Sequence, residues 1–148
     1  MIPLDAGALP HGPAMRLIVK IVTLGEDRIT CCCRIPLKFP WAGSGALPAY
    51  MAVEGVAQAA GLLAAGPVPG ESTLKGLAGE SPQGYLVRIR EAEFSSTDLD
   101  PQGTWTATAV MAGRSGKVVL CRGEAWQAGA LLLRARFALY LESSGQSR

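Results

Sequence analysis

The segment at residues 47–65 constrains the fold more than any other part of the chain, because it reads as a helix that is apolar on nearly every side. Pro48 suits a first helical turn, where its missing N–H has no intrahelical partner to lose. A helix that is apolar all round is a buried helix. Three polar side chains recur every four residues, at Tyr50, Glu54 and Gln58, and therefore form one stripe. A carboxylate in that setting is costly unless it is hydrogen-bonded or paired, so Glu54 is a candidate catalytic group.

The composition is that of a globular chain, since 49% of the 148 residues are hydrophobic and 18% are charged. This length fits a single domain over residues 1–148. The 14 basic and 12 acidic residues are dispersed and give a net charge of +2, so we expect no nucleic-acid partner. The longest apolar stretches contain glycine, proline or charge, which predicts that the chain does not span a membrane. The N-terminal residues lack the charged and apolar regions of a secretory signal, so we expect a cytoplasmic protein.

The cysteines favour a reducing compartment. Three of the four are consecutive, Cys31, Cys32 and Cys33, and successive strand side chains point to opposite faces, so they cannot all pair locally. The fourth is Cys121, the chain has a single histidine, and no Cys-x-x-Cys spacing occurs. We therefore expect no metal and no cofactor. Reduced thiols that pack as small hydrophobic side chains fit this pattern.

The rest of the chain reads mainly as β-strands. Two runs, 16–24 and 28–35, are joined by Gly-Glu-Asp and predict a hairpin. After a connection rich in glycine and proline at 66–84, four more runs favour strands, at 85–94, 104–111, 117–126 and 131–141. The last run also contains good helix formers, but its alternation favours a strand. The N-terminal segment 1–15 and the loop 36–45 read as irregular, and 143–148 reads as a frayed tail.

This order of elements predicts an α+β domain. A curved antiparallel sheet of about five to six strands would wrap around one long buried helix at 48–65. Such a sheet covers the helix from one side only. A second subunit would cover the other side and the strand edges, so we expect a dimer.

Several short motifs along the chain match a known family. They are Leu9-Pro10-His11 before the first strand, Phe39-Pro40 in the following loop, Leu47-Pro48 at the helix start, and Glu54 with Ala57-Gln58 inside the helix. These motifs and the order of elements resemble the hotdog-fold β-hydroxyacyl-(acyl-carrier-protein) dehydratases of fatty-acid synthesis. The Leu-Pro-His motif and the altered loop are similar to the divergent dehydratase-like proteins of aryl polyene pigment clusters. The resemblance implies a hotdog fold and an acyl thioester substrate, carried by acyl carrier protein or coenzyme A.

Two positions depart from the family pattern. The residue before Phe39-Pro40 is Lys38, where the resemblance implies a catalytic histidine that works with the helix carboxylate of the other subunit. The residue after the helix-start proline is Ala49, where the resemblance implies a glycine whose backbone amide polarises the thioester carbonyl. A backbone amide survives the second change, whereas an imidazole does not survive the first.

Two residues are candidates for acid/base chemistry. Glu54 would act as general acid or base near the thioester, or it is a structural glutamate paired with Arg88 or Arg90 at an interface. His11 is the only imidazole in the chain and lies between prolines in a stiff segment. It would substitute for the missing histidine, or the Leu-Pro-His segment packs structurally at the sheet edge.

Four further residues are candidates for substrate binding. Gln58 would orient Glu54 or cap an acyl tunnel, or it is a buried structural amide. The Ala49 amide would stabilise an enolate-like oxygen at the positive helix N-terminus. Tyr50 would line an apolar channel, or it belongs to the core. Lys38 would bind a phosphopantetheine phosphate as a point charge, or it is a solvated loop lysine.

Three functions remain open from the sequence. The first is a 3-hydroxyacyl-(acyl-carrier-protein) dehydratase-like enzyme that uses Glu54, in fatty acid or polyene biosynthesis. The second is a hotdog acyl thioesterase, in which Glu54 activates water or attacks the carbonyl. The third is a non-catalytic acyl-binding or partner subunit of a hotdog heterodimer. The partner chain is accordingly a second copy in a homodimer or a hotdog homologue in a heterodimer.

Overall fold

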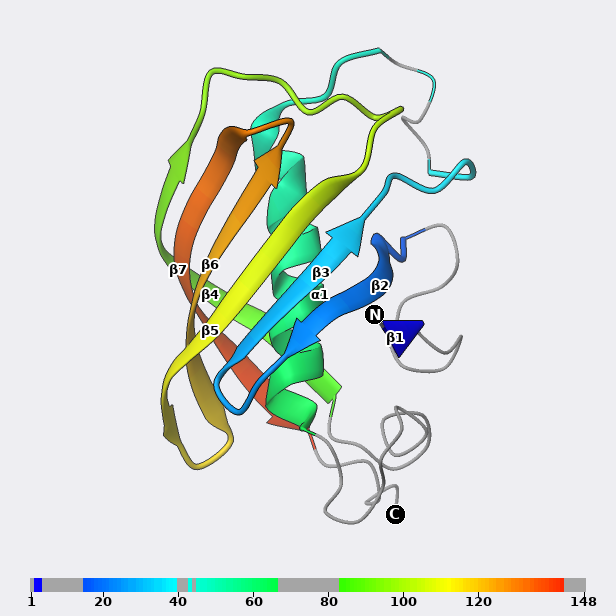
Figure 1. The fold of residues 1–148 in the computed structure, drawn as a ribbon. Helices are drawn as coiled ribbons and strands as arrows, with labels where there is room; N and C mark the ends of the chain where they lie inside the picture. The colour runs from blue at the N-terminus through cyan, green and yellow to red at the C-terminus, as the bar shows by residue number, and fades with distance from the viewer. Residues whose placement is uncertain (1, 4–14, 40–42, 44, 67–82, 143–148) are drawn as a thin grey trace.

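One long helix packs against one antiparallel sheet (Figure 1). The computed structural model describes residues 2–3, 15–39, 43, 45–66 and 83–142. The helix α1 (Ala52–Ala65) follows a short 3-10 turn, η1 (Ala49–Met51). The strands, in chain order, are β1 (Ile2–Pro3), β2 (Ile18–Leu24), β3 (Arg28–Cys33), β4 (Gln83–Phe94), β5 (Trp105–Ser115), β6 (Val118–Gln127) and β7 (Ala130–Glu142). Their order in the sheet is β1-β2-β3-β5-β6-β7-β4.

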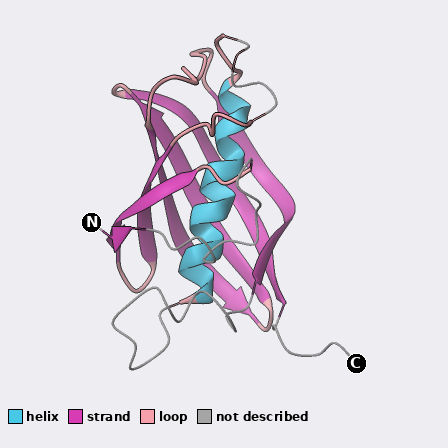
Figure 2. Cartoon of the chain, turned by 90° about the vertical axis from the view of Figure 1, so that its right-hand side faces the viewer, coloured by secondary structure: helices cyan, strands magenta, loops and turns pink. Residues whose placement is uncertain are grey.

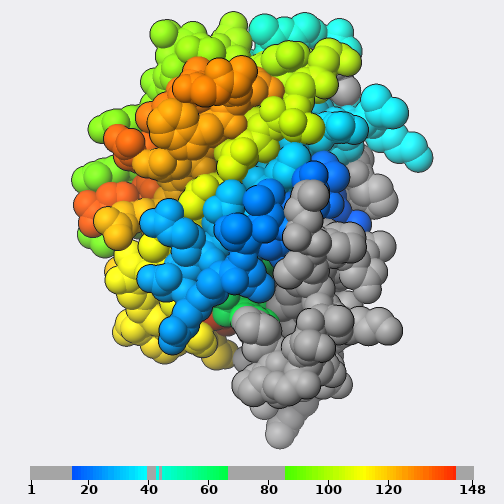
Figure 3. Space-filling model, in the orientation of Figure 1, coloured from blue at the N-terminus to red at the C-terminus, as the bar shows by residue number. Residues whose placement is uncertain are grey.

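This architecture confirms the predicted α+β fold of a curved antiparallel sheet around one buried helix. Figure 2 shows the helix lying lengthwise on one face of the sheet, with the strands behind it. In the space-filling view the strands form a continuous surface that hides nearly all of the helix (Figure 3). The predicted hairpin is present, because β2 and β3 pair antiparallel around the turn that contains Gly25.

Alternation along the strands places the core as the sequence predicts. On β3, Ile29, Cys31 and Cys33 are buried towards the helix, whereas Arg28 is exposed on the outer face. On β7, alternate residues from Leu133 to Leu141 are buried in the same way. The period-2 pattern of 131–141 therefore identified a strand in spite of its helix-forming residues, because only a strand buries alternate residues on one face.

Two glycines let the helix approach the sheet closely. A Cβ built on Gly55 of α1 would overlap Cη2 of Trp105 and lie 2.9 Å from Cζ2 and Cζ3 of the same indole. A Cβ on Gly123 of β6 would overlap Cγ1 of Val56 and lie 3.1 Å from the carbonyl oxygen of Thr108. The absence of both side chains therefore sets how deep the helix sits, and with it the depth of Glu54.

The structure corrects two details of the expected elements. Ile2–Pro3 forms the two-residue strand β1 within the segment expected to be irregular, and it pairs with β2. Proline is tolerated there because β1 is at the edge of the sheet. On β4 the sequence alternates apolar Val87 and Ile89 with Arg88 and Arg90, which predicts a regular strand. The structure breaks this alternation, because the register against β7 shifts between Leu86 and Arg88 and again between Ile89 and Glu91. Most of the expected connection 66–84 and the tail 143–148 lie outside the described residues.

Candidate acid/base site on the central helix

Glu54 lies in the first turn of α1, on the one stripe of the helix that the sheet does not cover. Pro48 precedes η1 with φ −60° and ψ 145°, an extended conformation from which the helix begins. Glu54 is half-buried, and so are Val53, Ala57 and Gly61 along the same side of the helix. A carboxylate in a first turn is stabilised by the unpaired N–H groups and the positive end of the helix dipole. This interaction offsets part of the cost of its burial.

Gln58 is the buried polar partner of Glu54. Its side chain is only 2% exposed, and it is the one polar side chain among the buried residues that the structure describes. Its Nε2 donates to Oε1 of Glu54 at 3.0 Å and to the carbonyl oxygen of Met15 at 2.7 Å. Its Oε1 accepts a hydrogen bond from the backbone N–H of Leu17 at 3.0 Å. The sequence prediction that Gln58 lies one turn from Glu54 therefore corresponds to a direct contact.

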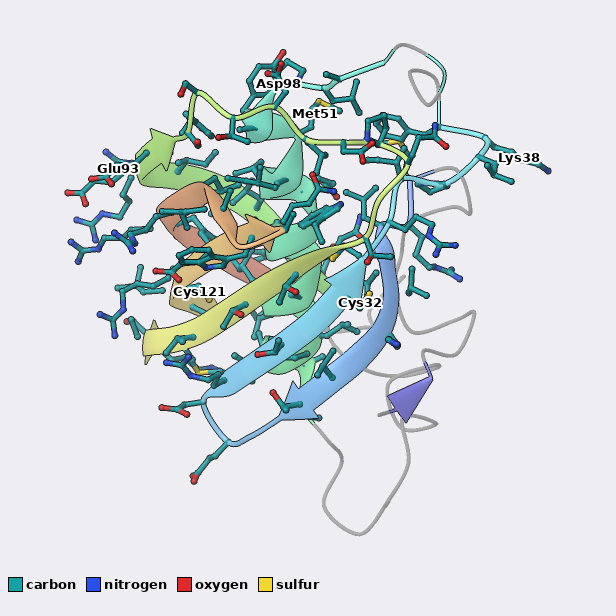
Figure 4. All side chains as sticks on the ribbon, turned by 45° about the horizontal axis from the view of Figure 1, so that its top comes forward. Cys32, Lys38, Met51, Glu93, Asp98 and Cys121 are labelled. Carbon is teal, nitrogen blue, oxygen red and sulfur yellow. The ribbon has the colours of Figure 1, made fainter. Side chains whose placement is uncertain are left out.

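The other candidate residues lie in different surroundings. Ala49 is buried at the start of η1, in the first helical turn, where backbone N–H groups have no intrahelical acceptor. Tyr50 is 56% exposed, and its ring meets that of Phe94 edge to face at 6.4 Å between centroids. Lys38 is exposed in the loop after β3 and extends outward from the molecule (Figure 4). His11 lies outside the described residues.

A separate open cavity of about 410 Å³ lies near the amino-terminal end of the helix. It contains none of the predicted site residues and so does not coincide with Glu54. The cavity is lined by Gly43, Gly45, Ala46, Asp98, Asp100, Pro101 and Gln102.

Across residues 15–39, 45–66 and 83–142, three or more histidine, cysteine or acidic side chains never gather in a group that could hold a metal ion. Within the same ranges, every helix is too short or too polar to cross a membrane.

All four cysteines are free thiols, as the sequence predicts. Burial raises the pKa of Cys31 to about 12 and that of Cys121 to about 11, from 9.0 in each case. Burial also raises the pKa of the Cys33 thiol, with the neighbouring Cys31 and Cys32 adding to the effect. The thiols of Cys31, Cys33 and Cys121 therefore stay protonated at neutral pH and pack as small apolar groups, so none of these three is a nucleophile.

The contact between Gln58 and the segment leading into β2 is the part of the site that the sequence did not predict. Both partners of the Gln58 amide there are backbone groups, the carbonyl of Met15 and the N–H of Leu17. Backbone groups are the same in every residue, so no residue type at these positions signals the contact. The only available signal was the buried amide itself, which must find partners somewhere.

Solved structures of low sequence identity share this fold. The dehydratase heterocomplex ApeI:P from Xenorhabdus doucetiae matches with a TM-score of 0.71 at 18% identity, over 93% of this chain and 90% of that chain. A hypothetical thioesterase from Streptococcus pneumoniae, solved with coenzyme A, gives 0.58 at 9% identity, over 86% and 88%. A mutant thioesterase from Staphylococcus aureus gives 0.58 at 16% identity, over 83% and 92%. These likenesses establish the hotdog fold.

The sequence itself matches a family model. No match to the chain was found among curated proteins. A model described as ApeP dehydratase, of the ApeP-like family, matches residues 5–146 and so covers nearly the whole chain. This match confirms the resemblance drawn from the Leu-Pro-His motif and the helix motif. The chain belongs to the ApeP-like dehydratase family of aryl polyene clusters.

Proposed function

We propose that this chain is the carboxylate-bearing subunit of a 3-hydroxyacyl-thioester dehydratase. The observation that carries the proposal is Glu54, half-buried in the first turn of α1 and held there by Gln58. Loss of water from a 3-hydroxyacyl chain requires a base for the C2 proton and an acid for the departing 3-hydroxyl. A positioned carboxyl group can serve in either role. Membership of a family described as dehydratases supports this class of reaction.

The thioester carbonyl would lie at the start of the helix. The backbone amide of Ala49 is in the first turn, at the positive end of the helix. An amide at that place can donate to the carbonyl oxygen as negative charge develops on it during removal of the C2 proton. The substrate is then an acyl thioester of acyl carrier protein or coenzyme A, with C2 between the Ala49 amide and the Glu54 carboxyl.

A second acid/base group has to join Glu54. Lys38 stands where the family pattern has histidine, and its exposed side chain extends away from the molecule. The remaining source in this chain is His11. The other source is a partner subunit, and the structurally similar ApeI:P is a dehydratase heterocomplex. We therefore propose a hotdog partner that supplies the imidazole while this chain supplies the carboxylate.

The free edge of β4 is the surface that fits such a partner. In the described part of the chain β4 pairs only with β7, so its other edge presents unpaired backbone groups. Four apolar residues are exposed on this strand, and an apolar strand edge is a ready template for pairing with another chain. The helix α1, which carries Glu54, also packs against β4. The exposed residues are Leu86, Val87, Ile89 and Phe94.

The experiment is an assay of the full chain, alone and in complex with a co-expressed hotdog dehydratase subunit, on 3-hydroxybutyryl-coenzyme A. Formation of the enoyl thioester and release of free thiol are followed separately. We expect water loss in the complex and its abolition in Glu54→Gln, because the amide matches the carboxyl in shape yet cannot accept a proton. Glu26→Gln, in the exposed β2–β3 turn, is the matched control and should keep full activity.

Other outcomes identify the other functions. Thiol release without water loss, abolished in Glu54→Gln, would identify a thioesterase and refute the dehydratase. If Glu54→Gln changes neither turnover of the complex nor binding of the thioester, the chain is a non-catalytic partner subunit. Lys38→His tests the imidazole directly, because a gain of water loss by the chain alone would show that the pocket lacks only that group. His11→Ala should leave most of the activity when the partner supplies the imidazole.

A further inference from the structure

The orientation of the Gln58 amide is fixed by two backbone groups. The N–H of Leu17 can only donate, so the atom 3.0 Å from it must be the amide oxygen. The carbonyl of Met15 can only accept, so the atom 2.7 Å from it must be the amide nitrogen. Turning the amide over would break both bonds at a side chain that is 2% exposed, where lost hydrogen bonds are costly.

This fixed orientation determines what Gln58 can offer Glu54. The amide nitrogen carries two hydrogens, and one is directed to Met15. The other is directed to Oε1 of Glu54 at 3.0 Å, so that oxygen is an acceptor. In a protonated carboxyl group the oxygen without the hydrogen is the better acceptor. A proton carried by Glu54 therefore belongs on Oε2, whereas Oε1 keeps the bond to Gln58.

We infer that Gln58 is a positioning residue that ties the reactive oxygen of Glu54 to the backbone leading into β2. The inference rests on the proposed function of Glu54 as acid/base. The rigid link runs from the Met15 and Leu17 backbone through the Gln58 amide to Oε1 of Glu54. It fixes the rotation of the carboxyl group and so directs Oε2 to the place where a proton is taken or given.

The chain offers a matched control for this role. The amide of Gln127 also accepts from a backbone N–H, that of Asp100 at 2.8 Å. It also donates to backbone carbonyls, those of Asp100 at 3.0 Å and Thr104 at 3.4 Å. Gln127, the last residue of β6, thus makes the same kinds of bond without a hydrogen bond to Glu54. A variant that lacks the Gln127 amide therefore measures how much turnover falls when only a structural amide is lost.

The test compares Gln58→Met with Gln127→Met, each in complex with the co-expressed hotdog dehydratase subunit, in steady-state dehydration of 3-hydroxybutyryl-coenzyme A. Methionine keeps the length of the side chain and removes all of its hydrogen bonds. We expect Gln58→Met to lower kcat about a hundredfold with little change in KM, as expected for a misplaced catalytic group. Gln127→Met should keep kcat within about twofold, since no catalytic group depends on it. Equal kcat values for the two variants would overturn the inference and leave the proposed function standing.

A second measurement does not depend on turnover. In the nuclear magnetic resonance spectrum of the ¹⁵N-labelled protein, Glu54→Ala should shift one of the two Nε2 protons of Gln58 and leave the Leu17 amide proton in place. An unchanged Gln58 amide in Glu54→Ala would overturn the inference, whatever the activity. If the parent shows no dehydration but the proton shifts as expected, the proposed function fails while the positioning of Glu54 by Gln58 is supported.

Discussion

A methyl group added at Gly55 tests the closest approach of the helix to the sheet. In a helix interior, alanine is more favourable than glycine by about 1 kcal/mol. At Gly55 the new Cβ would overlap the indole of Trp105, which is 2% exposed and packed on all sides. Carbon atoms prefer separations of about 3.5–4.0 Å, so either the ring or the helix must move. Such overpacking typically costs about 1–3 kcal/mol.

The same helix supplies the control. Gly61 is also in α1, and a Cβ there would meet nothing within 4 Å. Gly61→Ala should therefore show the helix gain alone, whereas Gly55→Ala shows the gain and the overlap together. The free energy of unfolding of Gly55→Ala should be lower than that of Gly61→Ala by about 1–3 kcal/mol.

Urea unfolding at one fixed protein concentration measures this difference, because the stability of an oligomer depends on concentration. With a slope of about 2 kcal/mol per molar urea, the midpoint of Gly55→Ala should fall roughly 0.5–1.5 M below that of Gly61→Ala. The slopes themselves should agree. Equal midpoints would refute the reasoning, since the helix would then not rest on Trp105 as closely as the structure places it.

Two further predictions concern the core. Burial raises the pKa values of Cys31 and Cys121 to about 12 and about 11, so above pH 9.0 the unfolded chain loses these protons first and stability falls. The two thiols together should cost about 3 kcal/mol of unfolding free energy by pH 10. Cys33, whose pKa burial also raises, adds to this loss. Cys31→Val should reduce the total loss by about 1.4 kcal/mol in urea titrations. Gly123→Ala should destabilise by about 1–3 kcal/mol, because its Cβ would overlap Val56. Gly113→Ala on β5, where a Cβ meets nothing within 4 Å, should not; a comparable loss at both glycines would contradict the packing argument.

The sequence predicted the central helix and the strand 131–141 correctly, for different reasons. The helix is apolar on nearly every side, which indicates a buried helix. The strand buries alternate residues, which is the spacing of its own backbone. The β4 strand shows where this reasoning fails. Its alternation places Val87 and Ile89 on one buried face, yet one register shift falls at Val87, a second follows Ile89, and both side chains are exposed. A bulge adds a residue without changing residue types, so alternation alone does not reveal it.

The candidate site was predictable in part, because two of its residues follow the regular spacing of a helix. The spacing of Glu54 and Gln58 places them on one helical face, and the contact between them follows. The position of the segment before β2 does not follow, because its bonds to Gln58 come from the backbone of Met15 and Leu17. The spacing places the three polar residues on one stripe but does not rank them by burial. The structure shows a gradient along the stripe, from the exposed Tyr50 through the half-buried Glu54 to the buried Gln58.

That gradient bears on why the proposed reaction needs a partner. Glu54 lies at the boundary between a buried amide and a helix stripe that the sheet leaves uncovered. A carboxylate open to water is well solvated and interacts weakly with a substrate proton, whereas exclusion of water strengthens each electrostatic interaction in the site. A subunit paired with the edge of β4 would cover this stripe as well as bring an imidazole. Assembly therefore changes the surroundings of Glu54 and the set of acid/base groups in one step, and we expect the complex to exceed the isolated Lys38→His chain in dehydration even though both would contain the two groups.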